Sequence, residues 1–283
     1  MNRFSTSLLG EARTLLLATD GSHFSDGALQ EAIFFSQACQ ARLIVLHVVT
    51  IDAESLKSAN ARVTRKRGEI AAYMEDIRKM ARDSGVECET VVVGSSVPEH
   101  AIVEQARMRE VDVILMGRHG RSGRLYLMVG SMTSKVIGLG FPMVLMVPKD
   151  FLITGAHVLV AVDDSPCSRL AVEEALSLGL CCVTLERLTF VAVARRRSGM
   201  DEARRMAEEA CARGRQKWPH LHFEAVADVG HASNIIVRAA EERKVDMIMI
   251  GGMVAGALPR MFTGRITKEV CGWAHCAVLV VTA

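Results

Sequence analysis

The chain has 283 residues and a mass of 30.8 kDa, which suggests two domains at about 150 residues each. Half of its residues are hydrophobic and 23% are charged, a composition that excludes a disordered chain. The 34 Lys and Arg residues against 32 Asp and Glu leave a net charge of +2, which is too even a balance to indicate a nucleic-acid or membrane-surface partner.

The sequence favours a cytoplasmic location. No apolar run approaches the ~20 residues that a membrane-spanning helix needs. The first residues, MNRFSTSLLGEAR, lack the apolar segment of a signal peptide. The eight cysteines form no CxxC pair and mostly lie in apolar or helical stretches, so we expect reduced thiols in an intracellular protein.

Short apolar runs rich in Val, Ile, Leu and Met alternate with helical patterns along the first half of the chain. The runs show little polar alternation, which is typical of parallel strands buried on both faces. The predicted helices are Ser25–Cys39, Ala53–Ser84, Pro98–Glu110 and Met132–Leu139. The predicted strands are Thr14–Thr19, Leu43–Val49, Glu89–Val93, Val111–Met116 and Met143–Val147.

After a linker at about Lys149–Gly155, the same alternation resumes in the second half. Alternating strands and helices predict an open parallel sheet with helices on both faces and right-handed crossovers. The predicted strands here are His157–Val162, Leu188–Ala194, His222–Ala227, Val245–Ile250 and Ala277–Thr282.

The two halves repeat one another. The segment from Leu15 (LLLATDGSHFSDGALQEAI) aligns with the segment from Val158 (VLVAVDDSPCSRLAVEEAL) at an offset of 143 residues. Two later segments, which begin at Ile102 and Pro142, align with downstream segments at a shared offset of 134 residues. These matches indicate an internal duplication of about 140 residues. We therefore divide the chain into domains 1–150 and 151–283.

Two segments at strand ends in the first domain contain residues suited to a ligand. Ligands of open α/β sheets bind beyond the carboxyl ends of the strands, where the strand order reverses. Asp20 follows the first strand and can accept hydrogen bonds from a sugar or a base. The segment from Met116 to Ser131 follows the fourth strand, and its glycines allow a close approach of the backbone. Ser131 can cap the next helix, whose free N–H groups attract a phosphate, so we infer a mononucleotide across the crevice.

The spacing Gly117-x2-Gly120-x9-Gly130-Ser131 resembles the G-x2-G-x9-G-(S/T) pattern of the universal stress protein family, and the opening ATDGS, from Ala18, matches too. The resemblance extends over essentially the whole chain as two tandem copies. It implies an α/β fold with two tandem, doubly wound five-stranded parallel sheets of order 3-2-1-4-5. This fold is of the nucleotide-binding α-hydrolase-like type. It further implies that the fifth strands join the copies as a pseudo-dimer.

By this resemblance, the first domain holds ATP, or ADP or AMP, with the need for Mg²⁺ left open. Asp20 and the main chain near Val48 would hold the adenosine, and the loop after the fourth strand would line the ribose and phosphates. His119 is either a phosphate-side residue or a solvated loop residue. The expected nucleotide-binding residues are Ala18, Thr19, Asp20, Val48, Met116, Gly117, Arg118, His119, Gly120, Gly130, Ser131 and Met132.

The second domain departs from this pattern. Val254 stands at the position of the second glycine, where a β-branched side chain crowds the backbone. Arg265 replaces the Ser or Thr, which removes a capping hydroxyl but adds a cation that can attract an anion, so binding there is weakened rather than excluded. Asp164 replaces Gly21 and adds a negative charge. We therefore expect an intact nucleotide-binding loop in the first domain and a degenerate loop in the second, which becomes a structural or regulatory half.

Simpler interpretations stay open for several of these residues. The glycine loop can form tight turns without a ligand, and Asp20 can act as a helix cap or form a local Asx turn. Cys271, His275 and Cys276 lie close together in the sequence but lack a fourth zinc ligand, so we expect no metal. A redox role for the adjacent Cys181 and Cys182 lacks a local motif that would lower a thiol pKa.

The chain lacks the nucleophile elbow, the HExxH motif, the Walker lysine motif and the dinucleotide fingerprint, so we expect no catalytic residue and at most a weak ATPase. The preferred prediction is an ATP-binding stress-response protein in which the nucleotide regulates conformation, assembly or partner binding. One alternative is a slow ATPase or a nucleotidyl or phosphoryl transferase. Another is a non-catalytic dimerisation scaffold, and a homo-oligomer is compatible with each.

Overall fold

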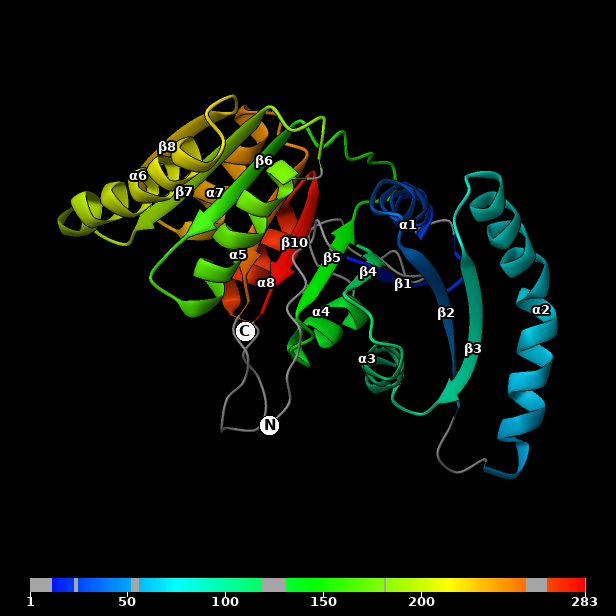
Figure 1. Cartoon of the computed structure of the whole chain (residues 1–283). Helices are drawn as coiled ribbons and strands as arrows, with labels where there is room; N and C mark the ends of the chain where they lie inside the picture. Colours follow the sequence, from blue (N-terminus) through cyan, green and yellow to red (C-terminus); the bar gives the residue numbers. More distant parts are fainter. Residues whose placement is uncertain are drawn as a thin grey trace.

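The computed structural model describes residues 12–22, 25–51, 56–118, 131–180, 182–252 and 264–282, without the side chains of 56–63, 66–67 and 131. Its strands form one continuous sheet with helices on both faces (Figure 1). Among the described helices, none is both long and apolar enough to cross a bilayer.

The first half contributes five strands and four helices to the described structure. Pro98 starts α3, where its missing N–H costs no hydrogen bond. Gly140, with φ of +67°, follows α4 in the left-handed conformation that ends many helices. The strands are β1 (Thr14–Ala18), β2 (Arg42–Thr50), β3 (Cys88–Ser95), β4 (Val113–Gly117) and β5 (Met143–Val147). The helices are α1 (Asp26–Cys39), α2 (Leu56–Asp83), α3 (Pro98–Met108) and α4 (Ser131–Gly138).

The second half repeats this order of elements. All ten predicted strands are present, and each predicted boundary lies within two residues of the observed one. The strands are β6 (His157–Val162), β7 (Arg187–Ala194), β8 (His222–Val229), β9 (Met247–Gly251) and β10 (Ala277–Val281). The helices are α5 (Pro166–Ser177), α6 (Met200–Lys217), α7 (Ala232–Glu242) and α8 (Arg265–Trp273), with short 3-10 turns η4 (Leu178–Leu180) and η5 (Arg197–Gly199).

The strand order is β3-β2-β1-β4-β5-β10-β9-β6-β7-β8. Each half therefore has the order 3-2-1-4-5 with parallel neighbours, as the family resemblance implies. β5 and β10 pair antiparallel, with Leu145 directly opposite Leu279, its equivalent in the repeat. The two halves are thus joined through their fifth strands, which confirms the expected internal pseudo-dimer.

Each face of the sheet is covered by helices from both halves. One hydrophobic core includes residues of α1, α2, α5 and α6, such as Ala28 and Ala171. The other includes residues of α3, α4, α7 and α8, such as Val136 and Val270. Successive strand residues alternate between the two cores, as Leu15 and Leu16 do, because the side chains of a strand point to opposite faces.

Two buried carboxyl groups, one from each half, hold the linker between the domains. Glu31 of α1 accepts a hydrogen bond from the Ile153 N–H at 2.7 Å, and Asp246 accepts one from the Thr154 hydroxyl at 2.7 Å. Glu31 is only 2% exposed, and this burial raises the pKa of its carboxyl to about 7, with a smaller contribution from Asp246. The linker is therefore fixed against both halves.

Candidate functional site

The candidate site begins where β1 and β4 end side by side. Ala18 is paired with Met116, and both side chains are buried. The chain leaves β1 towards α1 on one face of the sheet, whereas it leaves β4 towards α4 on the other. This divergence is the topological switch point at which open α/β sheets bind their ligands.

The loop after β1 is organised around Asp20. Its Oδ1 accepts hydrogen bonds from the N–H of Ser22 at 3.0 Å and from the hydroxyl of Ser22 at 2.6 Å. The Ser25 hydroxyl donates to the same oxygen at 3.4 Å. Asp20 therefore forms the local Asx turn that the sequence left open, and its contact with a sugar or base stays a prediction.

Helix α2 packs against the same loop. Gly21 has φ of +73°, and a Cβ built there would lie 3.2 Å from Cδ1 of Ile70. The Thr19 hydroxyl lies 3.3 Å from the Tyr73 hydroxyl and accepts a hydrogen bond from the N–H of Gly21 at 3.0 Å. Burial raises the pKa of Tyr73. The sequence did not single out Ile70 or Tyr73, because their approach to this loop depends on how a long helix docks.

The end of β2 borders the loop from the other side. His47 Nδ1 lies 3.0 Å from the Thr19 carbonyl oxygen, and its side chain is buried, so His47 is a core histidine with a hydrogen-bond partner. Val48 follows it, half-buried and paired with Val93 of β3. The main chain near Val48 therefore lies at the same strand edge as Thr19 and Asp20.

The exit of β4 is tied to the start of α4. The Thr133 hydroxyl, itself buried, donates to the Gly117 carbonyl oxygen at 3.1 Å. This bond holds the first turn of α4, with half-buried Met132, against the strand end. Ser131 is the first residue of α4, although its side chain lies outside the described residues. His119, Gly120 and Gly130 also lie outside the described residues.

Arg118 connects the strand end to the second half. Its N–H continues the sheet by donating to the Val147 carbonyl oxygen at 3.0 Å. Its guanidinium donates to the Ala274 carbonyl oxygen, at the end of α8, at 2.6 Å. Burial lowers the pKa of Arg118. The structure thus shows a contact between the halves for this residue, and its predicted role at the ligand stays untested.

The second half preserves the framework of this site. The Thr267 hydroxyl donates to the Gly251 carbonyl oxygen at 3.2 Å, the same tie as in the first half. Asp163 Oδ1 accepts from the Ser165 N–H at 2.9 Å, as Asp20 does from Ser22. The duplication therefore extends to individual hydrogen bonds.

The second half differs from the first in backbone conformation and packing at the ends of β6 and β9. Gly21 has a positive φ and adopts the left-handed conformation, whereas Asp164, at the equivalent position of the second half, does not have a positive φ. Gly252, the counterpart of Arg118, is enclosed: a Cβ there would lie 2.7 Å from Cγ1 of Val280. The strand end of β9 is therefore closely packed against β10.

The helix that follows differs in charge. Arg265 Nε pairs with Glu269 Oε1 at 2.7 Å, and the Ser233 hydroxyl donates to Glu269 Oε2 at 2.7 Å. Hydrogen bonds from Arg265 and Ser233 lower the pKa of Glu269, which keeps it ionised. At the equivalent position of α4 stands Lys135, paired with Glu99 of α3 at 2.9 Å. The same helix position thus carries a cation in the first half and an anion in the second.

The cysteine cluster does not resemble a metal site. The side chains of Cys271 and Cys276 are fully buried, and burial raises the pKa of each thiol to about 12. Among the described residues, no group of three His, Cys, Asp or Glu could hold a metal ion. Cys181 lies outside the described residues, so the paired-thiol alternative stays untested.

The architecture defines the class of the protein: a doubly wound α/β chain made of two copies of one unit, paired through their last strands. The sequence model of the universal stress protein family matches this chain twice, at residues 11–148 and 156–282. The chain belongs to the universal stress protein family, as a tandem of two such domains.

Individual relatives agree with this assignment. The universal stress protein YxiE of Bacillus subtilis is 31% identical over an alignment of 144 residues that covers 47% of this chain and 97% of YxiE. Universal stress protein MJ0531 of Methanocaldococcus jannaschii is 29% identical over 143 residues, 48% of this chain and 82% of MJ0531. Each of these relatives matches about half of the chain.

Solved structures agree on the fold. The crystal structure of a universal stress protein from Archaeoglobus fulgidus covers 96% of this chain and 99% of its own, with a TM-score of 0.77 and 19% identity. Another universal stress protein, solved in complex with cAMP, covers 50% of this chain and 99% of its own, with 24% identity and a TM-score of 0.38.

Proposed function

We propose that the first domain binds an adenine nucleotide, ATP foremost, and that binding regulates conformation, assembly or partner contact in a stress response. One observation carries this proposal. The start of α4 is fixed to the end of β4 by the bond from Thr133 to Gly117, next to the Asp20 loop at the switch point. Membership of a family with a cAMP complex supports a nucleotide as the ligand.

The physical basis is the amino end of α4. The first N–H groups of a helix have no partner within the helix, and the helix dipole adds partial positive charge there. Phosphate groups bind at such ends. The described part of α4 contains no acidic residue in its first turn, and its one basic residue, Lys135, pairs with Glu99 of α3. In this proposal Asp20 and the main chain near Val48 hold the adenosine, and Gly120 and Gly130 let the loop approach the phosphates.

The second domain, in this proposal, is a structural or regulatory half without a bound nucleotide. Glu269, in the second turn of α8, pairs with Arg265 and so takes up the cation at this helix start that would otherwise attract a polyanion. The predicted crowding by Val254 adds to this effect.

The test is calorimetry with ATP, ADP and AMP, each with and without Mg²⁺. We expect one nucleotide per chain and a loss of binding in Gly120→Val and Gly130→Val. Gly264→Val is the matched control, because Gly264 precedes α8 as Gly130 precedes α4, and it should leave binding unchanged. Binding that survives both first-domain variants would overturn the proposal. Phosphate release, measured in the same samples, tests the alternative of a slow ATPase.

A further inference from the structure

The outer edge of β8 carries a row of backbone groups that point away from the sheet. β8 is the last strand of the sheet and pairs with β7. The N–H of His222 donates to Glu186 and that of Gly230 to Ala194, so the even-numbered residues of β8 face β7. Hydrogen-bonding residues alternate along a parallel strand, which makes the odd-numbered residues face outward. These are Phe223, Ala225, Ala227 and Val229.

Side chains cap both ends of this outward row. Arg215 Nη2 donates to the Phe223 carbonyl oxygen at 3.2 Å, and Asp228 Oδ1 accepts from the Val229 N–H at 2.7 Å. In the described part of the chain, no such cap exists for Ala225 or Ala227. The N–H and C=O groups of these two alanines are therefore available to another strand.

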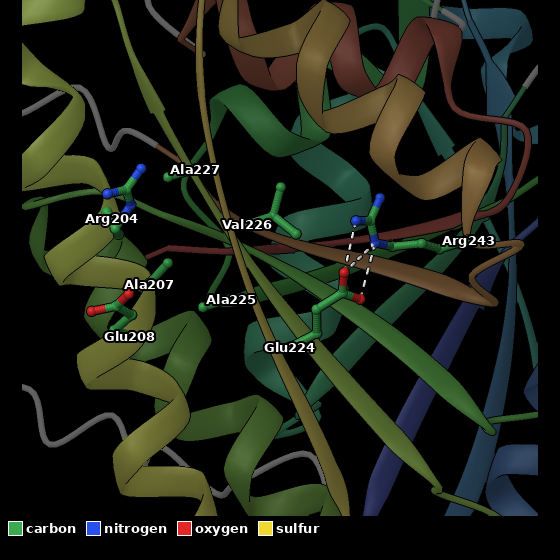
Figure 2. A pocket seen from close by; sticks show the side chains of 8 residues that line it. All are labelled: Arg204, Ala207, Glu208, Glu224, Ala225, Val226, Ala227 and Arg243. Carbon is green, nitrogen blue, oxygen red and sulfur yellow. Dashed lines mark hydrogen bonds and ion pairs between the residues drawn. The ribbon is translucent and has the colours of Figure 1, made fainter.

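A hollow of about 340 Å³ runs along this open stretch (Figure 2). The two residues with open backbone groups, Ala225 and Ala227, line this hollow with small side chains. α6 leads into β8 through residues 218–221 and runs in the opposite direction, which puts Arg204 beside Ala227 and Glu208 beside Ala225 (Figure 2). Within the described residues, neither Arg204 nor Glu208 has an ion-pair partner.

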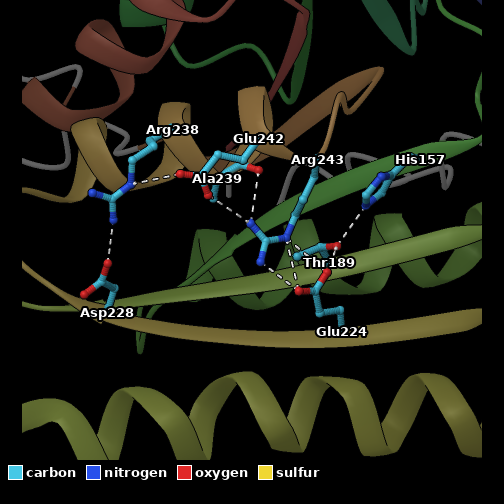
Figure 3. Close-up of polar contacts among 8 residues, drawn as sticks. All are labelled: His157, Thr189, Glu224, Asp228, Arg238, Ala239, Glu242 and Arg243. Atoms are coloured by element: carbon cyan, nitrogen blue, oxygen red, sulfur yellow. Dashed lines mark hydrogen bonds and ion pairs between the residues drawn. The ribbon is translucent and has the colours of Figure 1, made fainter.

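The carboxylates on the other face of β8 are paired with arginines. Arg243 donates to Glu224 at 2.7 Å, and Arg238 donates to Asp228 at 2.6 Å (Figure 3). Hydrogen bonds from Arg243 lower the pKa of Glu224, so the pair stays ionised. The same two arginines also pair with Glu242, at 3.8 Å from Arg238 and 3.7 Å from Arg243, so a second strand would meet charges that already have partners on this face (Figure 3).

We propose that β8 is a self-association edge, at which a second copy of the chain adds its own β8 in antiparallel orientation. The open groups define the register: Ala225 lies opposite the partner's Ala227, with a two-fold axis at Val226. Each such pair exchanges both N–H···O bonds, which gives four bonds across the interface. The two ten-stranded sheets become one.

The charges beside the strand single out a second copy as the occupant. The two-fold axis that pairs Ala225 with the partner's Ala227 also brings Arg204 towards the partner's Glu208, and Glu208 towards the partner's Arg204. The edge is thus complementary to itself, as an isologous interface requires. This surface lies on the outer strand of the second half and does not depend on the nucleotide proposed for the first.

Sedimentation velocity over a concentration series, up to the solubility limit, tests the proposal. The wild type should dimerise. Arg204→Glu and Glu208→Arg should each raise the dissociation constant about tenfold, since each replaces two attractions with two repulsions. The double swap, Arg204→Glu with Glu208→Arg, should restore the dimer. A wild type that is monomeric throughout, or a dimer whose dissociation constant is the same in the single-swap variants, would overturn the proposal.

A backbone variant tests the strand pairing itself. Ala227→Pro removes the outward N–H, which is not part of the ladder to β7, so the fold should persist while two of the four bonds are lost. Ala227→Ser keeps the N–H and is the matched control. We expect dimerisation to be lost in Ala227→Pro and kept in Ala227→Ser, with unchanged circular dichroism in both. Dimerisation at wild-type strength in Ala227→Pro would contradict edge pairing.

Discussion

The ends of β4 and β9 show one framework in two chemical settings. In both, a threonine in the first turn of the next helix donates to the glycine carbonyl at the strand end: Thr133 to Gly117 and Thr267 to Gly251. Around this shared bond the charges differ, because Lys135 of α4 is replaced by Glu269 in α8. The framework hydrogen bonds maintain the fold, and the residues around them set what each half can bind.

The largest expected effect tests whether the two halves are equivalent in their common core. Leu145 and Leu279 face one another across β5 and β10, and both are at most 1% exposed. Leu145→Ala and Leu279→Ala should each lower the free energy of unfolding by about 2–5 kcal/mol, by similar amounts. Urea denaturation measures this. A large cost in one variant and none in the other would contradict the pseudo-two-fold core.

The next effect is a pH dependence of the free energy of unfolding, which arises from Glu31 in the first half. The pKa of Glu31 is raised from 4.5 to about 7, so the folded state binds its proton more tightly than the unfolded state. The resulting stabilisation, about 3 kcal/mol, is complete below pH 4.5 and is lost as the pH rises through 7. Glu31→Gln should remove this slope and be more stable than wild type at pH 8. Equal slopes between pH 5 and 8 would count against the buried carboxyl.

A smaller effect distinguishes the contribution of the threonine hydrogen bonds to stability from their contribution to nucleotide affinity. Thr133→Val and Thr267→Val should each cost about 1 kcal/mol of stability, since each loses one hydrogen bond to a glycine carbonyl. Nucleotide affinity should fall in Thr133→Val alone. Thermal unfolding with and without ATP gives both quantities. An equal loss of affinity in Thr267→Val would show that the halves do not differ as proposed.

The smallest effect is a gain of binding in the second half. Replacing Val254 by Gly, Arg265 by Ser and Glu269 by Lys removes the predicted crowding and gives the second half the residues that the first half has at these positions. We expect a second, weaker nucleotide site, seen as a stoichiometry above one in calorimetry. The double variant that keeps Val254 is the control and should bind more weakly. No second site in the triple variant would mean that further residues, such as Asp164, decide the difference.

The sequence alone was sufficient to predict the strands, the duplication and, through the family resemblance, the pairing of the fifth strands. These follow from local composition and repeat offsets. The approach of Tyr73 to Thr19, the reach of Arg118 to Ala274 and the open edge at Ala225 were not predicted. Each depends on how distant segments dock, and such contacts leave no periodic pattern along the chain.

The most direct test of the functional difference between the halves is a crystal structure of the chain grown with excess ATP. We predict density for one nucleotide, beyond the ends of β1 and β4, with its phosphates at the start of α4. Nucleotide at equal occupancy beyond β6 and β9, or in the second half alone, would contradict the account.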